Sequence, residues 1–190
     1  GLAYSAYREK RNDILHTLTS YGFENVQADK LTYRNGYLVY SGITLDKDGF
    51  STISDIQVPV SYTDLLLRRK PEKIIINAVK LSGEYSRDTG LDIAGWRKSP
   101  FPPLASDVLI LNSGRLDLLT AAGALRFEAK GELTHKENRD MTLQAAVWTE
   151  QNQLQAQTTW NGKVSPDGRW VYEIDIQDGN LNLDQIQGVA

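Results

Sequence analysis

His16 and His135 are the two histidines of this 190-residue chain and its first candidates for acid–base or metal chemistry. They lie far apart, no H-x-x-x-H pair exists, and no third ligand stands at the spacing of a zinc site. The sequence also lacks the phosphate-binding patterns G-x-G-x-x-G and G-x-x-x-x-G-K-[ST], the nucleophile elbow G-x-S-x-G, and cysteine. We therefore expect a non-enzymatic protein without cofactor or metal, in which both histidines are structural or solvated.

Acidic side chains give one further candidate, because Asp46–Gly49 (DKDG) resembles the start of a calcium loop. An EF-hand loop beginning at Asp46 needs glycine at its sixth position and glutamate at its twelfth, where this chain has Ser51 and Gln57. An ordinary Asp-Gly turn is therefore the better interpretation. Glu84 follows a glycine within a predicted strand, and we expect it to face solvent.

The charge balance argues against nucleic acid as a partner. The chain carries 21 Lys and Arg against 24 Asp and Glu, a net charge of -3. Phosphate backbones are bound by basic surfaces, which this composition does not favour. The densest cationic group is Arg68-Arg69-Lys70, with Lys73 nearby. A solvated helix end is our preferred interpretation of this group, and an anion or lipid-headgroup site is the alternative.

A repeated hairpin phrase organises the elements that would position any site. Asn35-Gly36 separates two alternating arms, and this dipeptide is typical of a type I′ hairpin turn. Similar phrases recur at 111–118 and 176–183, with turns predicted at Gly114 and Gly179. In the first hairpin the apolar residues fall on both faces by simple alternation, as expected of a terminal unit. One face holds Tyr37, Val39, Ile43 and Leu45, and the other holds Leu38 and Tyr40.

Two helices are expected. Residues 2–21 place apolar side chains at the spacing of one helical face, and Gly22 provides the stop. Ser61 is a favourable N-cap for a short helix at 65–69, with Asp64 at the capping-box position and Pro71 ending it. Three consecutive leucines, residues 65–67, predict that this short helix is well buried.

The remainder is predicted to be strand and turn. We expect an amphipathic helical segment at 1–22 and a repetitive β-hairpin domain at 23–190, with a candidate subdivision at the proline-rich stretch 97–105. The predicted fold class is mainly β: a curved, antiparallel, repetitive sheet with an apolar concave face, one N-terminal helix and one short helix. The predicted strands are 26–33, 37–45, 51–60, 72–85, 91–96, 108–112, 115–120, 124–135, 141–149, 153–163 and 169–177.

The later strands alternate cleanly between apolar and polar residues, which predicts one buried and one wet face. Small residues interrupt the apolar series. This pattern suits either ordinary packing against another layer or a groove with room for an acyl chain. The groove candidates are Leu125, Phe127, Ala129, Leu133, Met141, Leu143, Ala145, Val147, Leu154, Ala156, Trp160, Tyr172 and Ile174.

The order of these phrases resembles the amino-terminal region of AsmA-like envelope proteins, particularly their YdbH and TamB relatives. An amphipathic helix leads through Gly22–Val26 into the first hairpin. The leucine run at 65–67 is followed by a strand ending at Gly83, and the phrases at 114–118 and 178–183 are similar to the repeated units of that family.

The resemblance implies a periplasmic protein, tethered to the inner membrane by a segment upstream of a fragment that begins at Gly1. It implies phospholipid acyl chains as the ligand and transport of phospholipid between the inner and outer membranes, with no catalytic residues. A membrane-anchored or envelope protein is a further expected partner. The alternative is a non-catalytic structural module whose apolar face is filled by the protein itself and whose strand edges bind a partner by β-augmentation.

Overall fold

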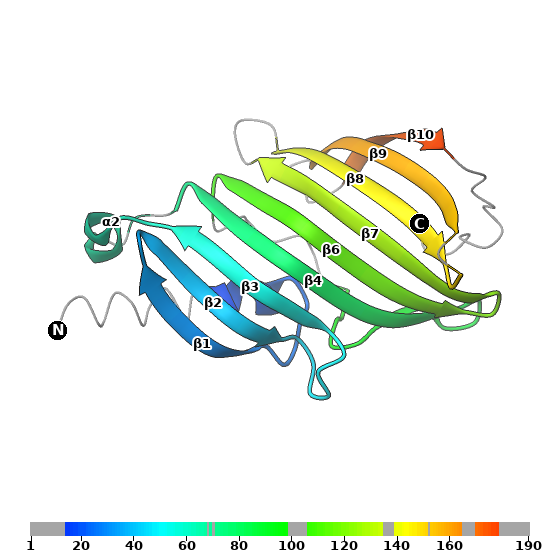
Figure 1. Cartoon of the computed structure of the whole chain (residues 1–190), viewed down its shortest axis with the longest axis horizontal. Helices are drawn as coiled ribbons and strands as arrows, with labels where there is room; N and C mark the ends of the chain where they lie inside the picture. Colours follow the sequence, from blue (N-terminus) through cyan, green and yellow to red (C-terminus); the bar gives the residue numbers. More distant parts are fainter. Residues whose placement is uncertain are drawn as a thin grey trace.

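The chain forms one large, open β-sheet in the computed structural model (Figure 1). The structure describes residues 14–67, 69, 71–98, 106–134, 139–151, 153–164 and 170–178. Nine strands follow one another across the sheet in the order β1-β2-β3-β4-β6-β7-β8-β9-β10, and β5 pairs with β4 beside this path. The predicted mainly β fold, with an N-terminal helix and one short helix, is confirmed.

All of the named strands belong to one sheet, and all except β5 are at least eight residues long. Residues 14–20 are helical, and residues 1–13 of the predicted first helix lie outside the described residues. The named elements are β1 (Gln27–Arg34), β2 (Tyr37–Thr44), β3 (Thr52–Pro59), α2 (Tyr62–Leu66), β4 (Lys73–Ser86), β5 (Gly90–Ile93), β6 (Val108–Thr120), β7 (Gly123–Thr134), β8 (Arg139–Thr149), β9 (Leu154–Val164) and β10 (Trp170–Asp178).

The first hairpin has the turn that its sequence predicts. Asn35 and Gly36 both have positive φ angles, of +52° and +80°, as a type I′ turn requires. A 2.9 Å hydrogen bond from the Val60 amide to the Gly36 carbonyl oxygen holds the turn to the connection between β3 and α2. Tyr33 adds a second contact here, because its hydroxyl donates to the Val60 carbonyl oxygen over 3.0 Å.

One pair of neighbouring strands is parallel, so the sheet is mixed. β4 and β6 run side by side from the Lys73–Val108 pair to the Glu84–Leu119 pair. The hairpin predicted at Gly114 is therefore wrong: β6 continues through Gly114, where the register with β7 shifts, and turns only before Gly123. The sheet also continues from one side of the candidate subdivision at 97–105 to the other, and residues 99–105 lie outside the described residues. The turn predicted at Gly179 also lies outside the described residues.

The buried apolar residues of the first strands change phase partway along each strand. In β2 and the residue after it, Leu38, Tyr40, Ile43 and Leu45 are all buried in one cluster. The two-faced interpretation of this hairpin is therefore wrong, because Gly42 adopts a φ of +62° and resets the alternation. The same change occurs in β3 and the residue after it, whose buried members are Ile53, Ile56, Val58 and Val60.

The phase changes fall on one line that crosses β2, β3, β4 and β6. In β4 the line is marked by Ala78, at a φ of +52°, and in β6 by the register shift between Leu111 and Gly114. Polar side chains connect the strands along it. Asn77 donates from Nδ2 to Asp55 Oδ1 over 2.7 Å, and Asn112 donates from Nδ2 to Asn77 Oδ1 over 2.7 Å.

The helix of residues 14–20 packs on the core of β2, β3 and the start of β4, through its buried residues Ile14 and Leu18 (Figure 1). A short backbone pairing holds the helix end in place. The Arg97 amide donates to the Gly22 carbonyl oxygen over 2.8 Å, and the Trp96 indole donates to the Tyr21 carbonyl oxygen over 3.0 Å. The predicted stop at Gly22 is confirmed by its φ of +111°.

The short helix differs from its prediction in position and burial. α2 begins directly after Ser61, whose hydroxyl accepts a 3.0 Å hydrogen bond from the Asp64 amide. Hydrogen bonding from Ser61 lowers the pKa of the Asp64 carboxyl, so the predicted capping box is present. The predicted burial is wrong: Leu66 and Leu67 are 39% and 57% exposed, because α2 stands out from the end of the sheet (Figure 1).

Two glycines are required where the N-terminal segment meets the sheet. A methyl group on Gly22 would overlap the Arg97 carbonyl oxygen, and one on Gly95 would overlap the Leu45 carbonyl oxygen. We expect Gly22→Ala and Gly95→Ala each to lower the free energy of unfolding by about 3 kcal/mol or more. Gly49→Ala is the matched control, since Gly49 has a φ of +73° but nothing within 4 Å. It should cost only about 1–2 kcal/mol in chemical denaturation.

The polar line across the sheet should also contribute to stability. Asn77→Ala removes two side-chain hydrogen bonds, and we expect it to cost about 1–2 kcal/mol. Asn161→Ala is the control, because Asn161 is exposed and accepts one 3.4 Å hydrogen bond from Thr142. Its effect in the same denaturation assay should stay within about 0.5 kcal/mol. Equal costs for the two variants would contradict a stabilising role for the line.

Candidate functional site

Most of the predicted groove residues come together on one face of β7, β8 and β9. The backbone register pairs Phe127 with Val147 and Leu143 with Trp160, and residues directly opposite each other point to the same side of a sheet. The same register holds Ala129 opposite Ala145, Leu125 opposite Thr149 and Val147 opposite Ala156. In the backbone pairing, Met141 lies opposite Leu133, and Tyr172 and Ile174 of β10 lie opposite Gly162 and Trp160.

Leu154 does not lie on this apolar face. The register between β8 and β9 shifts after the Val147–Ala156 pair, so that Leu154 lies opposite Trp148. Since Trp148 follows Val147 in β8, its side chain belongs to the other face. The simple alternation of the sequence could not reveal this bulge, because a bulge adds one residue to one strand without changing the residue types around it.

Two leucines of β6 extend the apolar face, and the sequence interpretation did not include them. Leu116 lies opposite Phe127, and Leu118 lies opposite Leu125. The alternation of these leucines was visible in the sequence, but the predicted hairpin at Gly114 assigned them to a separate strand pair. The apolar face therefore spans four neighbouring strands, β6 to β9.

A row of small residues crosses this face at right angles to the strands. Gly114, Ala129, Ala145 and Thr158 lie opposite one another in β6, β7, β8 and β9. Larger side chains follow on either side. The next row on one side contains Leu116, Phe127, Val147 and Ala156. The next row on the other side contains Leu111, Gly131, Leu143 and Trp160, so each border is interrupted by one small residue. The row is thus a strip of low side-chain volume between two higher borders.

Burial varies along the strip and its borders. In the strip, Thr158 is buried and Ala145 is half-buried, and in the borders Ala156 is fully buried, Val147 is buried and Trp160 is half-buried. Leu118 and Leu133, one row beyond the borders, are also buried. Thr158 carries the one hydroxyl of the row. It donates to the Ala145 carbonyl oxygen over 3.3 Å and accepts from the Trp160 indole over 2.7 Å, so its polarity is satisfied within the sheet.

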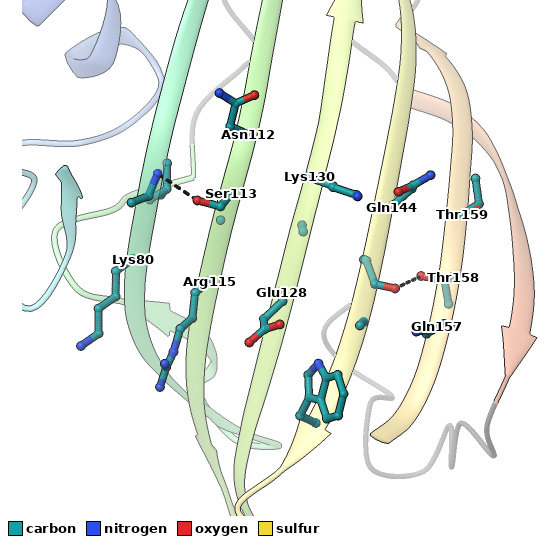
Figure 2. Close-up of a pocket in the computed structure, with 17 residues that line it drawn as sticks. Lys80, Asn112, Ser113, Arg115, Glu128, Lys130, Gln144, Gln157, Thr158 and Thr159 are labelled. Atoms are coloured by element: carbon teal, nitrogen blue, oxygen red, sulfur yellow. Dashed lines mark hydrogen bonds between the residues drawn. The ribbon is translucent and has the colours of Figure 1, made fainter. Parts of the chain in front are cut away.

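The opposite face holds a hollow of about 770 Å³ that is bordered by polar side chains (Figure 2). Its side chains come from β4, β6, β7, β8 and β9, and they alternate with the apolar residues along each strand. On this side the row of small residues contributes to the floor, between two rows of longer polar side chains. Those include Lys80, Arg115, Glu128, Lys130, Gln144 and Gln157, which Figure 2 labels.

Ion pairs run along the strands of this polar face. Arg115 Nε lies 2.8 Å from Asp117 Oδ1, and Arg126 Nε lies 2.8 Å from Glu128 Oε1. The Arg126 guanidinium also lies 5.5 Å from the centre of the Trp148 ring. Such exposed pairs add little stability, and they leave a wet surface suited to hydrogen bonding. Within the described residues, no group of three or more His, Cys, Asp or Glu could hold a metal ion.

Among the described residues, the remaining sequence candidates His16, Asp46 and Glu84 lie outside β6–β9. His16 is exposed on the helix, and His135 lies outside the described residues. Asp46 closes its own turn, because its carboxylate accepts from the Ser51 amide over 2.8 Å and from the Phe50 amide over 3.2 Å. This confirms the turn interpretation of Asp46–Gly49. Glu84 is exposed, as predicted.

Comparison of the chain with protein-family models, curated protein sequences and solved structures finds no significant match. In the part of the chain that the structure describes, no helix has the length and apolar character needed to cross a membrane. Function is therefore argued from the geometry of the two faces, together with the resemblance in sequence.

Substitutions on the apolar face should separate its buried part from its accessible part. Ala156→Glu places a charge where the side chain is fully buried, and we expect it to cost about 3 kcal/mol or more. Ala145→Glu should cost about 1.5 kcal/mol or less, because Ala145 is half-buried. Urea denaturation of both variants checks this. Unfolding of the Ala145 variant would mean that the strip is ordinary core.

Proposed function

We propose that this chain is a periplasmic lipid-binding segment of an AsmA-like protein that takes part in phospholipid transport between the inner and outer membranes. In this proposal the acyl chains lie on the apolar face of β6–β9, and a segment upstream of Gly1 tethers the protein to the inner membrane. The observation that carries the proposal is the strip of small residues between two apolar borders.

The direction of the strip supports an acyl chain as the ligand. The strip runs across the strands, so it follows the direction in which the sheet is extended by adding strands. Adjacent strands are about 4.8 Å apart, and a strip four strands wide is therefore about 14 Å long. An extended hydrocarbon chain laid along it would contact the borders on both sides. Each buried methylene contributes about 0.8 kcal/mol.

The division of the sheet into two parts also supports the proposal. The buried cluster that includes Ile14 and Leu18 gathers residues of β2, β3 and the start of β4, and no groove candidate of β7–β9 belongs to it. The helix therefore completes the core of one part. Among the described apolar residues of β6–β9, Leu109 packs against that cluster, and the others repeat the same face beyond it.

The alternative is a structural or protein-interaction module of the cell envelope. The observation that favours it is the open sheet: among the described strands, β1 and β10 each pair on one side only. Such strand edges can bind an added strand through main-chain hydrogen bonds. In this alternative the apolar face needs no lipid.

The amount of bound lipid distinguishes the lipid-binding proposal from the interaction-module alternative. We expect native mass spectrometry and solvent extraction of protein purified without detergent to find bound phospholipid. Ala145→Glu should reduce the bound lipid at least about tenfold, because a buried carboxylate on the strip opposes an acyl chain. Ala146→Glu is the matched control, since Ala146 is the next residue of β8 and belongs to the opposite face of the sheet. It should retain lipid.

Two results would contradict the proposal. One is a folded wild-type protein that carries no phospholipid after exposure to phospholipid vesicles. The other is equal lipid content in the Ala145 and Ala146 variants, which would place any bound lipid away from the strip. Either result would favour the interaction module.

A further inference from the structure

Exposed apolar side chains gather at one end of the sheet. Of the seven large hydrophobic residues that are exposed among the described residues, four belong to this end: Tyr37 at 38%, Tyr62 at 56%, Leu66 at 39% and Leu67 at 57%. Tyr37 lies opposite Pro59, just before the connection to α2. We call Tyr37, Tyr62, Leu66 and Leu67 the end patch.

The fold holds the end patch outward. α2 stands beside the end of the β1–β2 hairpin and away from the sheet (Figure 1). Ser61 caps the helix, and the Leu67 amide donates to the Thr63 carbonyl oxygen over 2.9 Å, so the helical turn extends to Leu67. Tyr62 and Leu66 are four residues apart and share one side of the turn. The exposure of these side chains is thus built into ordered structure.

Among the described residues, the exposed cations Arg34, Arg69 and Lys73 lie near the end patch in the chain or in the hairpin register, although the chain as a whole is acidic. Arg34 is exposed and lies opposite Tyr37 in the hairpin. Arg69 is exposed and forms a 3.2 Å ion pair with Asp64. Lys73 is exposed at the start of β4, and the sequence from Arg68 to Lys70 is entirely basic. Glu72 and Asp64 are the acidic residues of this segment, and the cations outnumber them.

We propose that the end patch docks on the surface of an anionic membrane. Leucine and tyrosine side chains on a protruding turn can enter the boundary between headgroups and acyl chains. Lysine and arginine beside them bind lipid phosphates, with their aliphatic stems against the apolar side chains. Docking through the end patch does not require acyl chains on the strip, so it is independent of the proposed transport function.

The size and shape of the end patch favour a membrane over a protein partner. A stable protein interface buries about 800 Å² on each partner, usually with a well-packed centre. Four side chains on a hairpin end and one helical turn present a convex surface of much smaller extent. A bilayer surface accepts such a shape, since lipids rearrange around the inserted side chains.

Vesicle flotation tests the proposal on the full chain. We expect binding to vesicles of phosphatidylcholine mixed with phosphatidylglycerol, much weaker binding to phosphatidylcholine alone, and a loss of binding as salt is raised. The double variant Leu66→Ser/Leu67→Ser should lower the affinity for these vesicles by a factor of about ten or more. Arg34→Gln should weaken binding about fivefold. Leu119→Ser is the control, because Leu119 is 55% exposed in β6, and it should bind as the wild type does.

Several outcomes would overturn docking. These are no binding to anionic vesicles, equal binding by the double variant and the Leu119 control, or a wild-type dimer that the double variant converts to monomers. Circular dichroism and thermal unfolding verify that each variant is folded. Ala145→Glu separates the two proposals. A variant that still binds vesicles but has lost its bound lipid supports both. A variant that no longer binds vesicles would place the membrane contact on the strip and overturn docking by the end patch.

Discussion

The structure depends on keeping one apolar face through strands whose alternation is interrupted. Side chains alternate with a period of two, so a single displaced residue would turn every later apolar side chain to the other face. In β2 the displacement is absorbed by Gly42 in a left-handed conformation, in β4 by Ala78, and in β6 by a register shift before Gly114. Because these adjustments lie side by side, the cluster under the helix and the apolar face of β6–β9 belong to one continuous surface. Asn77 connects β3, β4 and β6 along this line by hydrogen bonds.

That surface is used differently at the two ends of the sheet. At one end it is closed by the helix of residues 14–20, which the backbone pairing of Gly22 with Arg97 holds in place. At the other end the row from Gly114 to Thr158 reduces the side-chain volume on the apolar face and forms a strip there, and a hollow lies on the polar face. The proposed lipid binding uses the first of these two features, and the proposed membrane docking uses neither, since it depends on α2 and the hairpin end.

Much of the fold could be predicted from local patterns. The Asn35-Gly36 turn, the Gly22 helix stop and the Ser61 cap all depend on the conformations of a few neighbouring residues, and all three are present. The failures have non-local causes. Gly114 was assigned to a turn because its phrase copies the first hairpin, yet β4 and β7 flank β6 continuously there. The burial of Leu66 was inferred from its type, although its exposure is set by the position of α2 beyond the sheet.

The sequence by itself determined most of the strands and which residues of β7 and β8 share a face, because alternation with a period of two is a property of each strand alone. Only the tertiary structure decided which strands are neighbours, and therefore that β4 and β6 are parallel. It also decided the row of small residues, since Ala129, Ala145 and Thr158 line up only after the register of three strands is set. Exposure was likewise decided in three dimensions: whether a leucine is buried depends on what packs against it, and a local pattern does not contain that information.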